Sequence, residues 1–184
     1  MRKVLLTSAG FANKRVEDVF IRLVDKDPRQ LRALFIPTAA NNADAIAVLP
    51  ECMNDLLNLG IPSQNITVFD LHRTVSYEEL SEFDVVYLTG GSPEYLLSRI
   101  MDTHFHVPLA KFIDNRGIYI GVSAGSIVAT NNLPNSLNYI NCTLSVHRQA
   151  GTKSGPIDTA KNPHIDLTDN TAILIYGDTY QVVE

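Results

Sequence analysis

The sequence contains only two cysteines, Cys52 and Cys142, which are too few for a framework of disulfide bonds. Neither belongs to a CxxC pair, so we expect no zinc or redox site and no bound metal. A GxGxxG dinucleotide-binding motif is also missing, and we expect no cofactor. No apolar run approaches the roughly 18 residues that a membrane-spanning helix needs.

Basic residues are few and scattered. Lys and Arg number 15 against 20 Asp and Glu, which gives a net charge of −5 and no cluster of the kind that binds nucleic acid. The apolar run in the N-terminal "MRKVLLTSAGF" is too short for a signal peptide. We therefore expect a cytoplasmic protein whose partners are neither nucleic acid nor a membrane. A homodimer stays open, because apolar stretches that could form a dimer face cannot be told from core.

The length of 184 residues suits one domain spanning residues 1–184. Short apolar runs alternate with longer helical patterns, which predicts a doubly wound α/β fold with a mostly parallel sheet and helices on both faces. The predicted strands are 3–10, 31–39, 65–71, 84–91 and 117–123; the predicted helices are 42–60 and 92–103. Gly60 suits a helix C-terminus and Pro93 a first helical turn.

The pattern changes after residue 123. Residues 137–147 are expected to form another strand, followed by a polar loop over 148–163. Residues 171–184 read as a closing β-hairpin that turns at Gly177 and Asp178.

The segment "YIGVSAGSIVA" (119–129) carries the main chemical signal. Ser123 lies between Gly121 and Gly125 where a strand becomes a helix, which is the context of a nucleophile elbow. The alternative is a plain strand-to-helix turn made of small residues. The strand context favours the nucleophile.

The segment "TGGSPE" (89–94) ends a second strand of the predicted parallel sheet. Two successive glycines let main-chain N–H groups approach a substrate. The amides of Gly91 and Ala124 could form an oxyanion hole, worth about 3–4 kcal/mol per donor in known cases, with Gly90 and Ser92 contacting the substrate. The alternative is a phosphate-binding turn or a plain loop.

A base must accept the Ser123 proton, and two histidines are candidates. His147 ends an apolar strand, which is a rigid platform, whereas His164 lies in or just after a polar loop. We favour His147 and keep His164 as the alternative. The other three histidines lie in helical or connecting segments and are expected at the surface: His72, His104 and His106.

The third member of a triad is harder to find, because no Asp or Glu occurs between Ser123 and His147. A carboxylate would orient the imidazole and stabilise its cation. The candidates are Asp158, Asp166 and Glu94, of which Asp158 enters the predicted catalytic set.

Together, "FIPTA", "LTGGSPEYLL" and "GVSAGSIVA" resemble the dipeptidase E and cyanophycinase family of serine peptidases, whose fold is similar to class I glutamine amidotransferases. The resemblance extends from residue 3 to about 147. It implies a hydrolase with Ser123 as the nucleophile and the Gly91 and Ala124 amides as oxyanion donors.

The resemblance departs from the family pattern in three places. The family histidine ends a later strand in an "NPH" motif; the strand and spacing match His147, but the literal string ends at His164. The family acid follows the elbow in a "TND"-like segment, where this chain has Asn132. An amide cannot stabilise an imidazolium, which predicts slower turnover or another acid nearby. The chain after His147 is shorter than in the dipeptidase, so specificity for aspartyl dipeptides is not carried over.

The sequence thus predicts a serine-type peptidase or amidohydrolase that acts on a small peptide or amide through an acyl-enzyme on Ser123. The alternative is a weak or inactive relative that serves as a small-molecule binding module, and Asn132 motivates it. A phosphate or nucleotide binder built on "TGGS" is a third, less favoured hypothesis.

Overall fold

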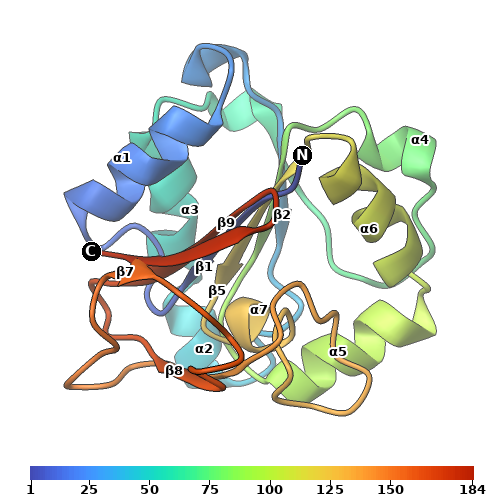
Figure 1. Cartoon of the computed structure of the whole chain (residues 1–184). Helices are drawn as coiled ribbons and strands as arrows, with labels where there is room; N and C mark the ends of the chain where they lie inside the picture. The colour runs from blue at the N-terminus through green and yellow to red at the C-terminus, as the bar shows by residue number, and fades with distance from the viewer.

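A computed structural model describes all 184 residues and places helices on both faces of a central sheet. In Figure 1, α1 and α3 cover one face, and α4, α5, α6 and α7 lie on the other side. The helices are α1 (Lys14–Leu23), α2 (Ala43–Ala47), α3 (Leu49–Asn58), α4 (Tyr77–Leu80), α5 (Pro93–Asp102), α6 (His106–Asp114) and α7 (Ala124–Ile127). The strands are β1 (Lys3–Thr7), β2 (Ala33–Ile36), β3 (Ile66–Val68), β4 (Val85–Leu88), β5 (Ile118–Val122), β6 (Thr143–Ser145), β7 (Gly155–Pro156), β8 (His164–Asp166), β9 (Ala172–Tyr176) and β10 (Thr179–Val183).

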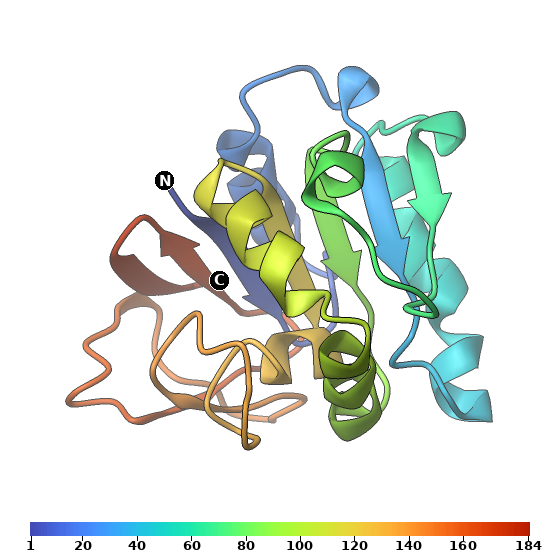
Figure 2. The same ribbon diagram turned by 90° about the vertical axis from the view of Figure 1, so that its right-hand side faces the viewer.

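Eight of these strands form one sheet in the order β3-β2-β4-β5-β1-β9-β10-β7. The first five run parallel, and β9 pairs with β1 in the antiparallel direction. Figure 2 shows the parallel strands pointing toward one end of the molecule, where the loops after α7 also lie. The predicted doubly wound α/β fold and the closing hairpin, β9 and β10, are confirmed.

The central strands are apolar at consecutive positions because both faces of the sheet are covered. All residues of β1, β2, β4 and β5 are buried. Their side chains divide between two hydrophobic clusters, of 29 and 19 buried residues. The larger cluster takes its helical members from α4, α5, α6 and α7, and the smaller takes them from α1 and α3.

The single helix predicted over 42–60 is wrong in one respect, because it breaks into α2 and α3 at Val48. Pro50 explains the break, since proline lacks an N–H and its ring clashes with the carbonyl four residues earlier. It is tolerated only in a first turn, and α3 therefore begins at Leu49. Gly60 follows the end of α3 with a φ of +93°, and Pro93 opens α5, as predicted.

The strand predicted over 137–147 is shorter than expected, because only β6 is extended. The amides of Leu137 and Tyr139 donate instead to the carbonyls of Val128 and Ala129, so this segment packs against the chain that follows α7. β6 pairs in parallel with β8 as a separate two-stranded sheet. The spacing of apolar residues could not reveal this local pairing.

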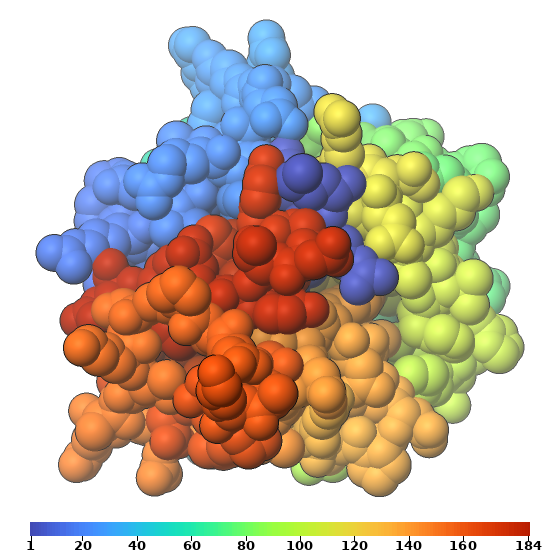
Figure 3. Space-filling view, viewed as in Figure 1, coloured from blue at the N-terminus to red at the C-terminus, as the bar shows by residue number.

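The C-terminal part of the chain, coloured orange to red, forms a continuous region of one face, next to the first residues of the chain (Figure 3). This arrangement brings segments that are distant in sequence to the end of the sheet where the strands β1, β4 and β5 terminate. None of the helices has the length and hydropathy that crossing a membrane requires.

Candidate active site

Ser123 lies at a sharp turn between β5 and α7. Its φ of +48° and ψ of −102° fall outside the regions that non-glycine residues favour, and such strain typically accompanies a functional site. The Ser123 amide donates to the carbonyl of Thr7 at 3.0 Å, which fixes the turn to the end of β1. The turn is therefore held from the neighbouring strand.

Both glycines of the GxSxG segment are required by packing. A Cβ on Gly121 would overlap the main chain of Gly125, and a Cβ on Gly125 would overlap the carbonyl oxygen of Leu88. The Tyr119 hydroxyl donates to the carbonyl of Gly125 at 2.6 Å and secures the first turn of α7. The elbow motif is thus a steric consequence of placing α7 directly over β4 and β5.

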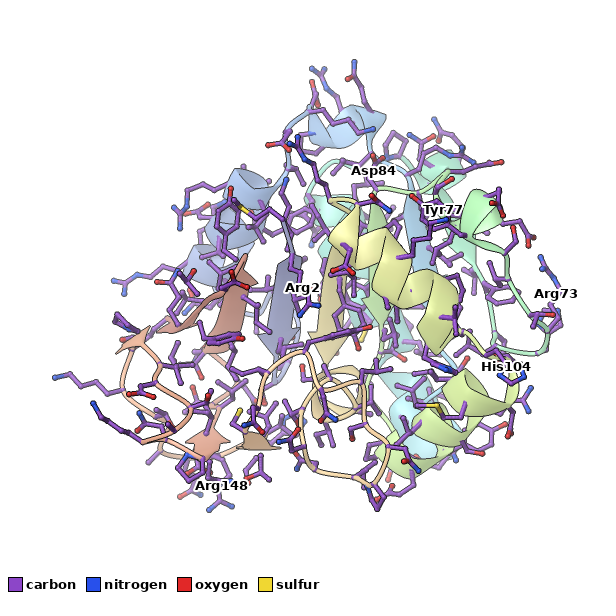
Figure 4. All side chains as sticks on the ribbon, turned by 45° about the vertical axis from the view of Figure 1, so that its right-hand side comes forward. Arg2, Arg73, Tyr77, Asp84, His104 and Arg148 are labelled. Atoms are coloured by element: carbon purple, nitrogen blue, oxygen red, sulfur yellow. The ribbon has the colours of Figure 1, made fainter.

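The imidazole of His147 faces this serine. His147 Nε2 lies 3.2 Å from Ser123 Oγ, within hydrogen-bond reach. His147 follows β6 with a φ of +56°, and its amide donates to Ser8 Oγ at 2.7 Å. The segment after β6 is therefore anchored to the end of β1. Figure 4 places the next residue, Arg148, at the opposite end of the molecule from Asp84, which directly precedes β4.

A carboxylate completes the arrangement, and it belongs to Asp169. Its Oδ1 lies 2.7 Å from His147 Nδ1 and accepts a second hydrogen bond from Ser8 Oγ at 2.8 Å. Ser8 is fully buried, so it holds both the histidine main chain and the carboxylate. The side chains of His147 and Asp169 are 53% and 56% exposed, so the imidazole is accessible to a substrate.

The charge of Asp169 determines which nitrogen of the imidazole carries the proton. Partial burial raises the pKa of this carboxyl, but the hydrogen bonds from Ser8 and His147 and the nearby imidazole together lower it below its usual value. An ionised carboxylate only accepts hydrogen bonds, so His147 Nδ1 is the donor. In this tautomer of the neutral imidazole, Nε2 faces the Ser123 hydroxyl as an acceptor.

Of the two expected oxyanion donors, Gly91 lines the cavity beside Ser123, and Ala124 directly follows Ser123 in the chain. The Gly91 amide has no acceptor within the protein. Ala124 is the first residue of α7, where the amide has no partner inside the helix. Gly91 has a φ of +137°, and a Cβ there would overlap the carbonyl of Ala39. Only glycine lets this amide approach the elbow.

The packing of Gly91 can be tested against a matched glycine. Gly155 has nearly the same φ, +138°, but no atom lies within 4 Å of the position of its absent Cβ. We expect Gly91→Ala to lower the free energy of unfolding by about 1–3 kcal/mol more than Gly155→Ala, because only Gly91 adds steric overlap to the shared backbone strain. Urea unfolding of both variants measures the difference. Equal losses would show that φ alone requires glycine at position 91.

A cavity of about 390 Å³ opens beside the serine, a size typical of small-ligand pockets. Four segments line it: the loop after β1, helix α3, the turn after β4, and the elbow with His147. The lining residues are Ser8, Ala9, Ala12, Val48, Glu51, Cys52, Asp55, Gly90, Gly91, Val122, Ser123 and His147.

The structure does not bring His164 and Asp158 to this cavity. His164 lies at the start of β8, where Nδ1 meets Thr143 Oγ1 and Nε2 meets Ser145 Oγ and Asp166 Oδ1. Asp158 lies in the 148–163 loop and accepts from the amide of Ala160. Neither contacts Ser123 or His147, because β8 pairs with β6 and directs these loops to the surface.

The other residues singled out in the sequence lie away from the cavity. Ser92 is the N-cap of α5, where its Oγ accepts from the amide of Tyr95, and it does not line the cavity. Asn132 binds the main chain of Leu144 through both amide atoms instead of orienting the histidine. His72 and His104 are exposed, as expected, whereas His106 is partly buried.

Sequence reasoning missed Asp169 and the role of Ser8. The predicted C-terminal hairpin could have pointed to Asp169. Because β9 runs antiparallel to β1, Ala172 pairs with Thr7, and the residues just before β9 reach the carboxyl end of β1. Ser8 belongs to the "SAG" that ends β1, and only its partners reveal its role.

Comparisons with known proteins find a matching family model and similar folds. The family model of peptidase family S51 matches residues 4–144. A crystal structure of a candidate peptidase E protein from Listeria monocytogenes EGD-e superposes with a TM-score of 0.76 at 21% identity, over 100% of this chain and 98% of that one. A peptidase from an acI-B1 actinobacterium superposes with a TM-score of 0.65 at 18% identity, over 100% and 87%. A search of curated proteins finds no match.

Proposed function

The chain belongs to peptidase family S51, a family of serine peptidases, and on this premise we propose that it cleaves short peptides through an acyl-enzyme on Ser123. The observation that carries the proposal is the hydrogen-bonded series of Ser123, His147 and Asp169 beside an open cavity. The strained turn and the accepting Nε2 both support Ser123 as the nucleophile.

In the first half of the reaction, His147 Nε2 accepts the Ser123 proton as the hydroxyl oxygen attacks the peptide carbonyl. The amides of Gly91 and Ala124 stabilise the negative charge that develops on the carbonyl oxygen. Asp169 holds Nδ1–H and stabilises the imidazolium. His147 then gives its proton to the leaving amine, and the C–N bond breaks.

In the second half, a water molecule replaces the departed amine. His147 accepts a proton from the water, which attacks the acyl carbonyl, and returns the proton to Ser123 as the ester bond breaks. The carboxylic acid product leaves and the enzyme is restored.

The size of the cavity supports a short substrate. About 390 Å³ accommodates a few side chains, and the pocket walls are short loops and the start of α3. An internal segment of a folded protein would not enter it.

A binding module without catalysis would be the alternative. It rested on Asn132 in place of an acid, and Asp169 supplies a carboxylate to His147 from another part of the chain. No observation now favours the binding module over the peptidase.

Replacing each of the two candidate histidines separately with alanine tests the proposal. We expect His147→Ala to lower kcat for a dipeptide library by at least about 10³-fold, since general base catalysis and imidazolium formation are both lost. His164→Ala should stay within about twofold of the native enzyme, because its ring contacts only the β6–β8 surface. The reverse pattern would reject His147 as the base.

A further inference from the structure

The cavity beside Ser123 has an uneven charge. Helix α3 contributes two carboxylates, Glu51 and Asp55, to its lining, and no Lys or Arg lines it. His147 is the single lining residue that can become positively charged. A substrate group that reaches α3 therefore meets negative charge.

Asp55 is held in a fixed position by groups that have no part in the peptidase reaction. Its Oδ2 accepts from the Tyr87 hydroxyl at 2.5 Å and from the Phe11 amide at 3.2 Å. Tyr87 is fully buried in β4. Gly10 leaves room for this carboxylate, because a Cβ there would overlap Oδ2.

The second oxygen of Asp55 is open. Oδ1 has no hydrogen-bond partner in the protein, and it is not among the buried atoms that lack one. One oxygen is thus used for anchoring, and the other is available in a cavity that also contains the nucleophile. A fixed, half-buried acceptor of this kind suits a cationic hydrogen-bond donor.

The surroundings of Asp55 leave its charge uncompensated. Burial raises the pKa of the Asp55 carboxyl to about 6; the bonds from Tyr87 and Phe11 oppose this rise, and the charges of Glu51 and Glu17 add to it. The group is mostly ionised at neutral pH, yet no cation of the protein contacts it. A positive group in the cavity would offset both the cost of burying this charge and the repulsion from Glu51.

We propose that the pocket recognises an ammonium group of the substrate, which binds Asp55 and Glu51 while the scissile carbonyl lies at Ser123. This inference rests on the proposed function, since the ligand is the peptide that Ser123 attacks. The ammonium is either the free N-terminus of a short peptide or a lysine side chain. A substrate carboxylate at this position is disfavoured, because it would meet two negative charges.

Binding is best measured in Ser123→Ala, so that the result does not depend on hydrolysis. The ligands are lysyl-alanine, norleucyl-alanine and glutamyl-alanine, each with a free and with an acetylated N-terminus. We expect isothermal titration at pH 7.5 to give at least a tenfold lower Kd for one ammonium-bearing form than for its neutral counterpart. A gain with the free N-terminus assigns the α-ammonium, and a gain of lysine over norleucine assigns the side chain.

Variants on α3 connect the preference to the carboxylates. In the same background, Asp55→Asn keeps an acceptor for Tyr87 and Phe11 but removes the charge, and should reduce the preference to less than about threefold. Glu51→Gln, at an exposed position, should weaken it as well and provides the test if Asp55→Asn does not fold. Asp102→Asn on α5, away from the cavity, is the control and should leave it unchanged.

The proposal is overturned if ammonium and neutral ligands bind equally, if glutamyl-alanine binds best, if no ligand binds, or if both α3 variants keep the full preference. The proposed function fails separately. A native enzyme that hydrolyses none of the peptides, while Ser123→Ala retains the ammonium preference, would contradict the acyl-enzyme alone.

Discussion

Ser123→Ala is expected to lower kcat/KM for peptide hydrolysis by at least about 10⁴-fold, because the acyl-enzyme cannot form without the hydroxyl. The backbone of the elbow should survive, since the amide bond to Thr7 and the packing of Gly121 and Gly125 do not involve the side chain. The site also accommodates alanine, because alanine is smaller than serine. Steady-state kinetics and thermal unfolding of the same preparation measure both quantities.

A matched serine provides the control. Ser145 lies on β6 and contacts His164 rather than His147, so Ser145→Ala should keep activity within about twofold. A Ser123→Ala variant that retains more than about 1% of native activity would show that another nucleophile, or a directly activated water, performs the cleavage.

Asp169→Asn is expected to lower kcat by about 10³- to 10⁴-fold with a small change in KM. Asparagine keeps the size of the side chain and an oxygen that can accept from Ser8 and His147, but it carries no charge, so the imidazolium loses its counter-charge. Because the hydrogen bond from Ser8 can persist, we expect the variant to keep the native fold. Stopped assays over a range of substrate concentrations separate kcat from KM.

Two aspartates serve as controls for Asp169. Asp158 and Asp166 were both candidates for the acid, and each binds groups away from Ser123: Ala160 and Lys161 for Asp158, and Arg148 and His164 for Asp166. Asp158→Asn and Asp166→Asn should stay within about threefold of native kcat. If either falls as far as Asp169→Asn, or if Asp169→Asn stays within tenfold, the carboxylate has been assigned wrongly.

The strain at Ser123 is compensated by its surroundings. A non-glycine residue at a positive φ costs on the order of 1–3 kcal/mol. Opposing it are the Ser123 amide bond to Thr7, the Tyr119 bond to Gly125, and Ser126 Oγ, which contacts the carbonyls of Thr7 and Gly121 at 2.7 and 2.8 Å. The elbow is thus maintained by β1 and β5 together.

Much of the fold could be predicted because it depends on local patterns. The strands β1, β2, β4 and β5 carry apolar runs and are buried at every position, and the turn at Gly177 and Asp178 specifies a hairpin. The nucleophile elbow could also be predicted from the sequence, because packing requires glycine two residues before and two residues after Ser123. These features need no knowledge of distant contacts.

The acid could not be predicted in the same way, because it depends on long-range pairing. Asp169 reaches His147 only because β9 runs antiparallel to β1 and because Ser8 bonds to both residues. The chain between Ser123 and His147 has no carboxylate, and the spacing of the later aspartates does not distinguish Asp158 or Asp166 from Asp169. The pairing of β6 with β8, which turns His164 to the surface, is hidden for the same reason.

The central claim is that one activated hydroxyl, that of Ser123, performs the covalent step. A fluorophosphonate that reacts with nucleophilic serines should add one equivalent to the native protein, and peptide mass spectrometry should place it on Ser123. Labelling should vanish in Ser123→Ala and fall sharply in His147→Ala, while Ser145→Ala labels normally. Modification of a different residue, or no modification of a folded native protein, would contradict the account.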